Sequence, residues 1–274
     1  AAVRGAGRAP LGNAPLTTGV EATLVLLGAF TAGAVNSTVG GGGLVQLPVL
    51  LAVYPQAVPA TLLGTNKLAS LVGTASAVLR YARHVAIPWR VVLPGAALAA
   101  VASLAGAATI SSVPPGLFRL LVPVMLASLL AYVVLHEDFG TNHAPRPLDG
   151  RIVASGTALF LALGFFDGFF GPGVGTFLLL GFVRVFGYDF LHAAASARFI
   201  NFSSNAAALA WFGWHGEVMW WLGAAMAAAN VVGAQAGTLL AIRHGNRLLR
   251  SAFIVVVCIL IARSSWDAWL SLGR

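Results

Sequence analysis

The stretch "VNSTVGGGGLVQLP", residues 35–48, places four consecutive glycines, Gly40 to Gly43, between two apolar segments. Inside a helix, glycine costs roughly 1 kcal/mol per residue relative to alanine, so the run predicts a helix break. Lipid supplies no hydrogen bonds, so unwound backbone at membrane depth occurs only where it is buried in protein or lines a cavity. The stretch therefore predicts a break that serves close packing or forms a binding site.

The composition indicates a membrane protein. The chain has 274 residues, of which 58% are hydrophobic and 9% charged, whereas a soluble domain carries about 25% charged residues. Its apolar runs are continuous, as in transmembrane helices, and do not alternate as barrel strands do. The net charge of +8 comes without a basic run, so nucleic acid is not expected as a partner. The single cysteine, Cys258, excludes an intramolecular disulfide and a multi-cysteine metal site.

The predicted fold is an all-α polytopic bundle of about 8–10 helical segments. A flexible segment (1–16) precedes the first transmembrane repeat (17–135), a polar cytoplasmic linker (136–151) separates it from the second repeat (152–264), and a tail (265–274) follows. The linker "HEDFGTNHAPRPLDGR" is rich in turn-forming residues. The expected helices cover residues 18–35, 44–53, 59–81, 88–110, 115–135, 152–169, 176–186, 190–213, 218–242 and 248–261.

The two halves align without gaps when the chain is shifted by 131 positions. Glycines of the two breaks coincide, and so do two lysine or arginine positions and two His/Trp loops. The aligned pairs are Gly33 with Gly164, Gly40 with Gly171, Gly42 with Gly173, Lys67 with Arg198, His84 with His215, Trp89 with Trp220, and Gly106 with Gly237. Paired interrupted helices in corresponding halves indicate a transporter binding site. We therefore expect an internal duplication.

Arginine placement predicts that the two repeats are inverted. The loops at 80–90 and 243–250 carry three arginines each and should be cytoplasmic, whereas the equivalent of the first, at 211–221, has none and should face outward. This requires that each broken first segment enters the membrane and returns as a helical hairpin. The segment 44–53 is only about 15 Å long, so whether it crosses completely stays open.

Three charges fall inside apolar segments: Lys67, Asp167 and Arg198. A charge at mid-bilayer costs about 2.5–3.5 kcal/mol on insertion scales, so we expect the two cations to line a cavity and bind an anion. The alternative is a structural pair of Arg198 with Asp167. Asp167 aligns with Asn36, so the repeats differ there by one titratable group, and Asp167 either takes up a coupling proton or balances Arg198.

Helical spacing places further polar side chains beside the two cations. Ser70 and Thr74 share a face with Lys67, and Asn201 and Asn205 share the equivalent face with Arg198. The helices that begin after Gly40–Gly43 and after the break at 171–175 would point the positive ends of their dipoles at the same cavity. The alternative is packing, since "GFFDG" (164–168) and "GAQAG" (233–237) are GxxxG patterns, and Gly33 and Gly106 are expected to serve packing.

These motifs resemble the sulfite exporter TauE/SafE family of membrane transporters. The resemblance is carried by "AGAVNSTVGGGGLVQLPVLLA", "GTNKLASLVGT", "LGFFDGFFGPGVGTFLLL" and "SARFINFSSN". It implies transport of sulfur-containing anions, coupled to an ion gradient. It also implies that a set of residues from both copies lines the pathway: Gly40, Gly41, Gly42, Gly43, Thr65, Asn66, Lys67, Gly171, Gly173, Arg198 and Asn201. The second copy departs from the first at Pro172 and Asp167.

Together, residues and resemblance predict a secondary transporter in the cytoplasmic membrane. Its substrate would be sulfite, sulfoacetate or another organosulfonate, moved by alternating access. The candidate binding residues are those above with Asn36, Ser70 and Asn205, and Asp167 is the candidate proton-coupling residue. An anion channel, a carrier for a non-sulfur carboxylate and a membrane scaffold remain as alternatives. No enzymatic motif, metal site or cofactor is expected; the partners are the anion and lipid, and a homodimer stays open.

Overall fold

The computed structural model is all-helical over the residues that it describes, which are 19–38, 41–83, 85–114, 116–118, 121, 123, 124, 127, 128 and 144–244. Described helices begin and end within three residues of the predicted bounds. They are α1 (Gly19–Thr38), α2 (Gly43–Val53), α3 (Pro59–Ala82), α4 (Trp89–Ser111), α6 (Gly150–Phe169), α7 (Val174–Phe186), α8 (Phe190–Trp214) and α9 (Trp220–His244). The predicted segments 1–16, 248–261 and 265–274, and most of 115–135, lie outside the described residues.

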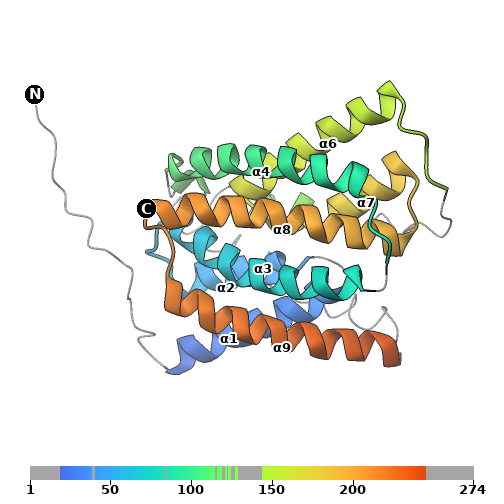
Figure 1. Ribbon diagram of the computed structural model, residues 1–274. Helices are drawn as coiled ribbons and strands as arrows, with labels where there is room; N and C mark the ends of the chain where they lie inside the picture. Colours follow the sequence, from blue (N-terminus) through green and yellow to red (C-terminus); the bar gives the residue numbers. More distant parts are fainter. Residues whose placement is uncertain are drawn as a thin grey trace, which may run out of the picture.

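The long helices lie side by side in a layered bundle. In Figure 1, α3 and α8 run through the middle, α1 and α9 lie on one side of them, and α4 and α6 on the other. Four described helices, α1, α3, α4 and α6, are long and apolar enough to cross a membrane. The short helices α2 and α7 have 11 and 13 residues, which gives them about 16 and 20 Å of length, too short for a complete crossing of about 30 Å.

The helix starts keep the register found in the sequence. Four pairs of starting residues are each 131 positions apart: Gly19 and Gly150, Gly43 and Val174, Pro59 and Phe190, Trp89 and Trp220. The chain colours in Figure 1 show that α1, α3 and α9 run in one direction and α4, α6 and α8 in the other. Each long helix of the first half is therefore antiparallel to its counterpart, and the α1–α9 contact corresponds to the α6–α4 contact.

Glycines allow the close approach of these helix pairs. A Cβ atom on Gly33 of α1 would lie 1.9 Å from the carbonyl oxygen of Asn230 in α9. At the equivalent place, a Cβ on Gly164 of α6 would lie 2.5 Å from the carbonyl oxygen of Ala99 in α4. A Cβ atom on Gly106 of α4 would likewise lie 2.1 Å from the carbonyl oxygen of Phe165 in α6. The packing role expected for Gly33 and Gly106 is thus confirmed, and the GxxxG glycines of α6 also lie against the backbone of α4.

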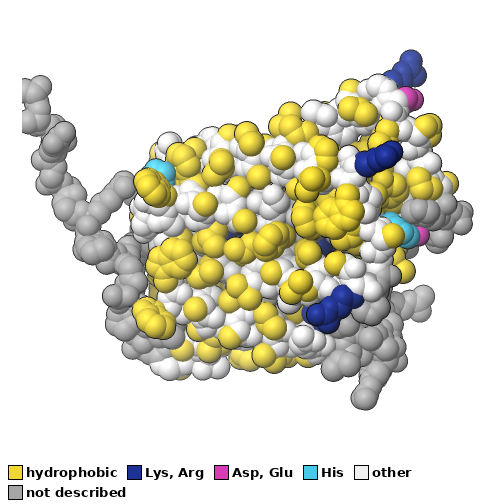
Figure 2. Space-filling view, viewed as in Figure 1, with side chains coloured by type: hydrophobic (Ala, Val, Ile, Leu, Met, Phe, Trp, Pro, Cys, Tyr) yellow, Lys and Arg dark blue, Asp and Glu magenta, His cyan; other side chains and the backbone are white. Residues whose placement is uncertain are grey.

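Charged side chains gather at one end of the bundle. Arginines at the end of α3, the starts of α4 and α6, and the end of α7 lie at the right-hand end in Figure 1, and Figure 2 shows Lys and Arg side chains there. The loop between α8 and α9, with His215 and Glu217, lies at the opposite end. A broad hydrophobic surface separates the two ends in Figure 2. This is the arrangement of a membrane protein with one basic face.

Candidate functional site

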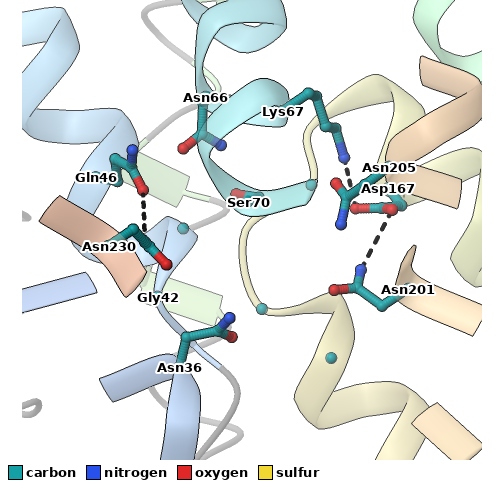
Figure 3. Close-up of a pocket in the computed structure, with 14 residues that line it drawn as sticks. Asn36, Gly42, Gln46, Asn66, Lys67, Ser70, Asp167, Asn201, Asn205 and Asn230 are labelled. Carbon is teal, nitrogen blue, oxygen red and sulfur yellow. Dashed lines mark hydrogen bonds and ion pairs between the residues drawn. The ribbon is translucent and has the colours of Figure 1, made fainter. Parts of the chain in front are cut away.

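A small polar cavity lies where the two halves of the bundle meet. Its volume is about 30 Å³, and it takes its lining from seven helices or the breaks between them. The lining residues are Asn36, Gly42, Gly43, Gln46, Asn66, Lys67, Ser70, Asp167, Gly171, Gly173, Gly175, Asn201, Asn205 and Asn230. Figure 3 shows Lys67 and Asp167 on one side of this cavity and the amides of Gln46, Asn66 and Asn230 on the other.

An ion pair between the halves forms the charged side of the cavity. The Lys67 ammonium on α3 donates to Asp167 Oδ1 on α6 at 2.7 Å, and the two side chains are 2% and 1% exposed. Asp167 Oδ2 accepts hydrogen bonds from Asn201 Nδ2 at 3.3 Å and from the Ser204 hydroxyl. The alternative that Asp167 pairs with Arg198 is therefore wrong. Lys67, which lies opposite the end of α6, holds the carboxylate instead.

Arg198 makes a separate contact at the end of α1. Its guanidinium donates to Asn36 Oδ1 at 3.0 Å and to the Asn36 carbonyl oxygen at 2.5 Å. This position suits a cation, because the last carbonyls of a helix carry partial negative charge. Arg198 is buried but does not line the cavity, whereas its partner Asn36 does. Arg198 therefore contacts Asn36, which lines the cavity, without lining the cavity itself.

The two cations make equivalent contacts across the halves. Lys67 and Arg198 are 131 positions apart, and so are their partners Asn36 and Asp167. Each cation leaves its own half and reaches the last turn of the first helix in the other half. The pattern is symmetric in geometry and asymmetric in chemistry, because one partner is a carboxylate and the other an amide.

Glycines of the two breaks let the backbone lie close to the Lys67–Asp167 pair and to α1. Gly171 has φ +90°, and a Cβ atom there would lie 2.9 Å from Lys67 Nζ. Gly173, with φ +83°, is the residue before α7. The break before α2 differs, because Gly42 has a right-handed helical backbone (φ −54°). Position 42 requires glycine for lack of space, since a Cβ atom there would lie 2.4 Å from the Ala32 carbonyl oxygen.

The remaining predicted residues take different places. Asn66, Ser70, Asn201 and Asn205 line the cavity, as do Gly42 and Gly43. Thr65 does not: its hydroxyl donates to the Thr61 carbonyl and accepts from the Met219 amide, which ties α3 to the start of α9. Gly41 lies outside the lining, where its carbonyl accepts from Leu44 N at 2.9 Å. Gly40 lies outside the described residues.

Two amides of the lining, Gln46 and Asn230, were missed in the sequence, as was Gly175. Asn230 Nδ2 lies 3.4 Å from Gln46 Oε1, and three buried atoms of this side have no protein partner: Gln46 Nε2, Asn66 Oδ1 and Asn230 Oδ1. The equivalent positions in the other half are apolar: Phe177, Ala197 and Ala99. A lone amide in a membrane helix is costly, and that signal could have identified both residues.

The arrangement offers hydrogen-bond donors, hydrogen-bond acceptors and the Lys67 ammonium. Within the described part of the chain, no group of three or more His, Cys, Asp or Glu side chains could hold a metal ion. The cavity also borders the first turns of α2 and α7, at Gly43 and Gly175, where the helix dipole favours negative charge. These groups suit a small anion.

Comparisons with known proteins point the same way. A family model described as "Sulfite exporter TauE/SafE" matches residues 25–264. "Probable membrane transporter protein ORF9" of Sinorhizobium sp is 34% identical over 240 residues, covering 87% of this chain and 90% of that protein. "Probable membrane transporter protein YfcA" of Escherichia coli K12 is 31% identical over 243 residues, 88% of each chain. A "Probable membrane transporter protein" of Haemophilus influenzae is 31% identical over 238 residues, which cover 87% of this chain and 92% of that protein. No solved structure matches the chain.

Proposed function

Because the chain belongs to the sulfite exporter TauE/SafE family, we propose that it is a secondary transporter that moves a small sulfur-containing anion across the cytoplasmic membrane. The family and relatives are named for transport rather than catalysis. Sulfite is the first candidate, and an organosulfonate such as sulfoacetate is the second. The anion would bind in the cavity at Lys67, close to the starts of α2 and α7.

The buried charges support an anionic substrate. Among the described residues, the buried charged side chains are Lys67, Asp167 and Arg198. These three side chains, called the buried centre below, carry a net charge of +1. Uncompensated charge in a low-dielectric interior is costly, and a bound anion removes it. Lys67 presents a compact ammonium that can exchange the Asp167 oxygen for an oxygen of the ligand.

The cavity size supports a small oxyanion over a bulky one. A water-sized group needs about 10–15 Å³ of such a volume, so a cavity of about 30 Å³ accommodates two or three of them. The three oxygens of sulfite are of that order. A longer organosulfonate needs the cavity to widen. The amides of Asn36, Asn201 and Asn205 supply donors around the ligand.

The antiparallel direction of equivalent helices supports alternating access as the mechanism. The antiparallel counterparts, the 131-residue register and a cavity between the halves are the features of transporters in which one repeat rocks against the other around a fixed site. We propose that α1–α2 and α6–α7 are the glycine-broken hairpins of these repeats. The arginine-rich end would face the cytoplasm.

The observation that carries the proposal is the buried Lys67–Asp167 pair in a cavity shared by both halves. Its test is thermal stabilisation of the purified protein by sulfite, thiosulfate, sulfate, sulfoacetate, acetate and phosphate. Binding to the folded state stabilises by about 2.7 kcal/mol at a ligand concentration of 100 Kd. We expect stabilisation by a sulfur anion that is lost in Lys67→Ala and kept in Arg83→Ala, which removes an exposed arginine just beyond α3.

Two outcomes would overturn this proposal. Stabilisation by acetate with none by sulfur anions would identify a carboxylate carrier. No stabilisation by any anion would leave the glycine breaks as packing devices. If Lys67→Ala does not fold, the double variant Lys67→Met with Asp167→Leu removes both buried charges and serves in its place.

A further inference from the structure

The two equivalent cation contacts differ in one respect, which is titration. Arg198 is held by Asn36, whose amide has no acid–base chemistry, while Lys67 is held by the carboxylate of Asp167. The geometry is otherwise matched, since both partners lie near the end of the first helix of the opposite half. Only the Lys67 contact can therefore be released by a proton.

Building on the proposed function, we propose that Asp167 is a proton-binding site that accompanies each doubly charged anion with one proton. The Lys67 ammonium has Asp167 Oδ1 at 2.7 Å, so an anion that binds Lys67 shares this cation with the carboxylate. Asp167 is 1% exposed, and its other donors, Asn201 and Ser204, are neutral. A buried carboxylate whose cation is neutralised by a doubly charged anion takes up a proton.

The proton balance is simple. One proton passes from the aqueous phase to a carboxylate oxygen of Asp167 and converts it to a carboxylic acid. Lys67 stays an ammonium ion and donates to an oxygen of the anion. Arg198 keeps both contacts with Asn36 throughout. No bond other than the new O–H bond is formed.

Charge decides which anion needs the proton. The buried centre carries +1 before binding, so a singly charged anion brings it to zero without a proton. A doubly charged anion would leave −1, and protonation of Asp167 brings it to zero. We therefore expect about one proton per dianion and none per monoanion.

No other described titratable group faces Asp167 closely enough to take this role. Lys67 comes from α3, and Arg198 from α8, where it interacts electrostatically with Tyr81 of α3. From α4, the Ser103 hydroxyl donates to the Ser204 carbonyl at 2.8 Å and does not titrate. The remaining described lining consists of amides, glycines and Ser70.

The test measures proton uptake on binding, in weakly buffered solution with a pH-sensitive dye. Thiosulfate serves as the dianion and methanesulfonate as the monoanion, because neither titrates near neutral pH. We expect about one proton per bound thiosulfate, none per bound methanesulfonate, and a thiosulfate Kd that falls about tenfold per pH unit of acidification. In Asp167→Asn, thiosulfate binding should take up no proton and be independent of pH.

Control variants separate the outcomes. Asp149→Asn changes a carboxylate that caps the start of α6, at the end of the bundle, and should keep the wild-type proton uptake. If Asp167→Asn does not fold, the comparison of proton uptake with thiosulfate and with methanesulfonate in the unchanged protein still decides the question. Thiosulfate binding without proton uptake would overturn the inference and leave the proposed function standing. If that binding required Na⁺, a sodium ion bound at the Asn66 and Asn230 oxygens would balance the second charge of thiosulfate in place of the proton. Binding of neither anion would overturn both.

Discussion

Replacing Gly171 by alanine should weaken the protein and its anion site together. With φ +90°, an alanine there bears a left-handed backbone penalty of roughly 1–2 kcal/mol. Its Cβ would also lie 2.9 Å from Lys67 Nζ and must push it away by about 0.5 Å. Because the same Cβ would lie 3.4 Å from Asp167 Oδ1, this move lengthens the Lys67–Asp167 distance from 2.7 Å to about 2.9 Å, which costs about 0.4 kcal/mol at an effective dielectric constant of 20.

Gly216 supplies a matched control, because it has φ +72° and open space around its Cβ position. Gly216→Ala should carry the backbone penalty alone, and Gly171→Ala should unfold about 1–2 °C lower than it. Because Gly171 lines the cavity of about 30 Å³, the added methyl group should also take space from the anion and weaken its binding in Gly171→Ala, while Gly216→Ala should leave anion affinity unchanged. Both are measured by thermal unfolding across an anion titration. Equal midpoints and equal affinities for the two variants would refute the reasoning.

Three further predictions concern packing, the second cation and topology. Gly164→Ala should destabilise the protein, because its Cβ would meet the α4 backbone at 2.5 Å, whereas Gly150→Ala has open space and should not; thermal unfolding of the two variants compares them. Arg198→Lys removes one of the two hydrogen bonds to Asn36 and should lower the free energy of unfolding by about 1–3 kcal/mol. An unchanged midpoint of thermal unfolding would contradict the role given to the two guanidinium hydrogen bonds. Single cysteines at positions 83 and 216 in a cysteine-free background should be labelled from opposite sides of the membrane, and labelling from one side would refute the inverted arrangement.

Helix positions were predictable from the sequence because they depend on local composition. Long apolar runs, glycines and prolines marked the ends of each helix, and the described helices agree within three residues. The spacing of the helix starts was also predictable, since a shift of 131 positions aligns both breaks and both cations in the sequence and four pairs of helix starts in the structure. The cavity residues on the faces of α3 and α8 followed from helical spacing.

The pairing of charges was not predictable, because it depends on how helices from different halves cross. Asp167 and Arg198 belong to the same half, yet each contacts a residue of the other half. Spacing along one helix cannot reveal this exchange. Gln46 and Asn230 lie on different helices, α2 and α9, and only the fold brings these two side chains together.

The most direct test of the account is counterflow in proteoliposomes. Vesicles preloaded with unlabelled sulfite should accumulate ³⁵S-sulfite transiently above its external concentration, because a carrier exchanges one bound anion for another at the same site. Lys67→Ala should abolish this exchange and Arg83→Ala should retain it. Labelled sulfite that only equilibrates, or exchange that survives in Lys67→Ala, would contradict a carrier built on the Lys67–Asp167 cavity.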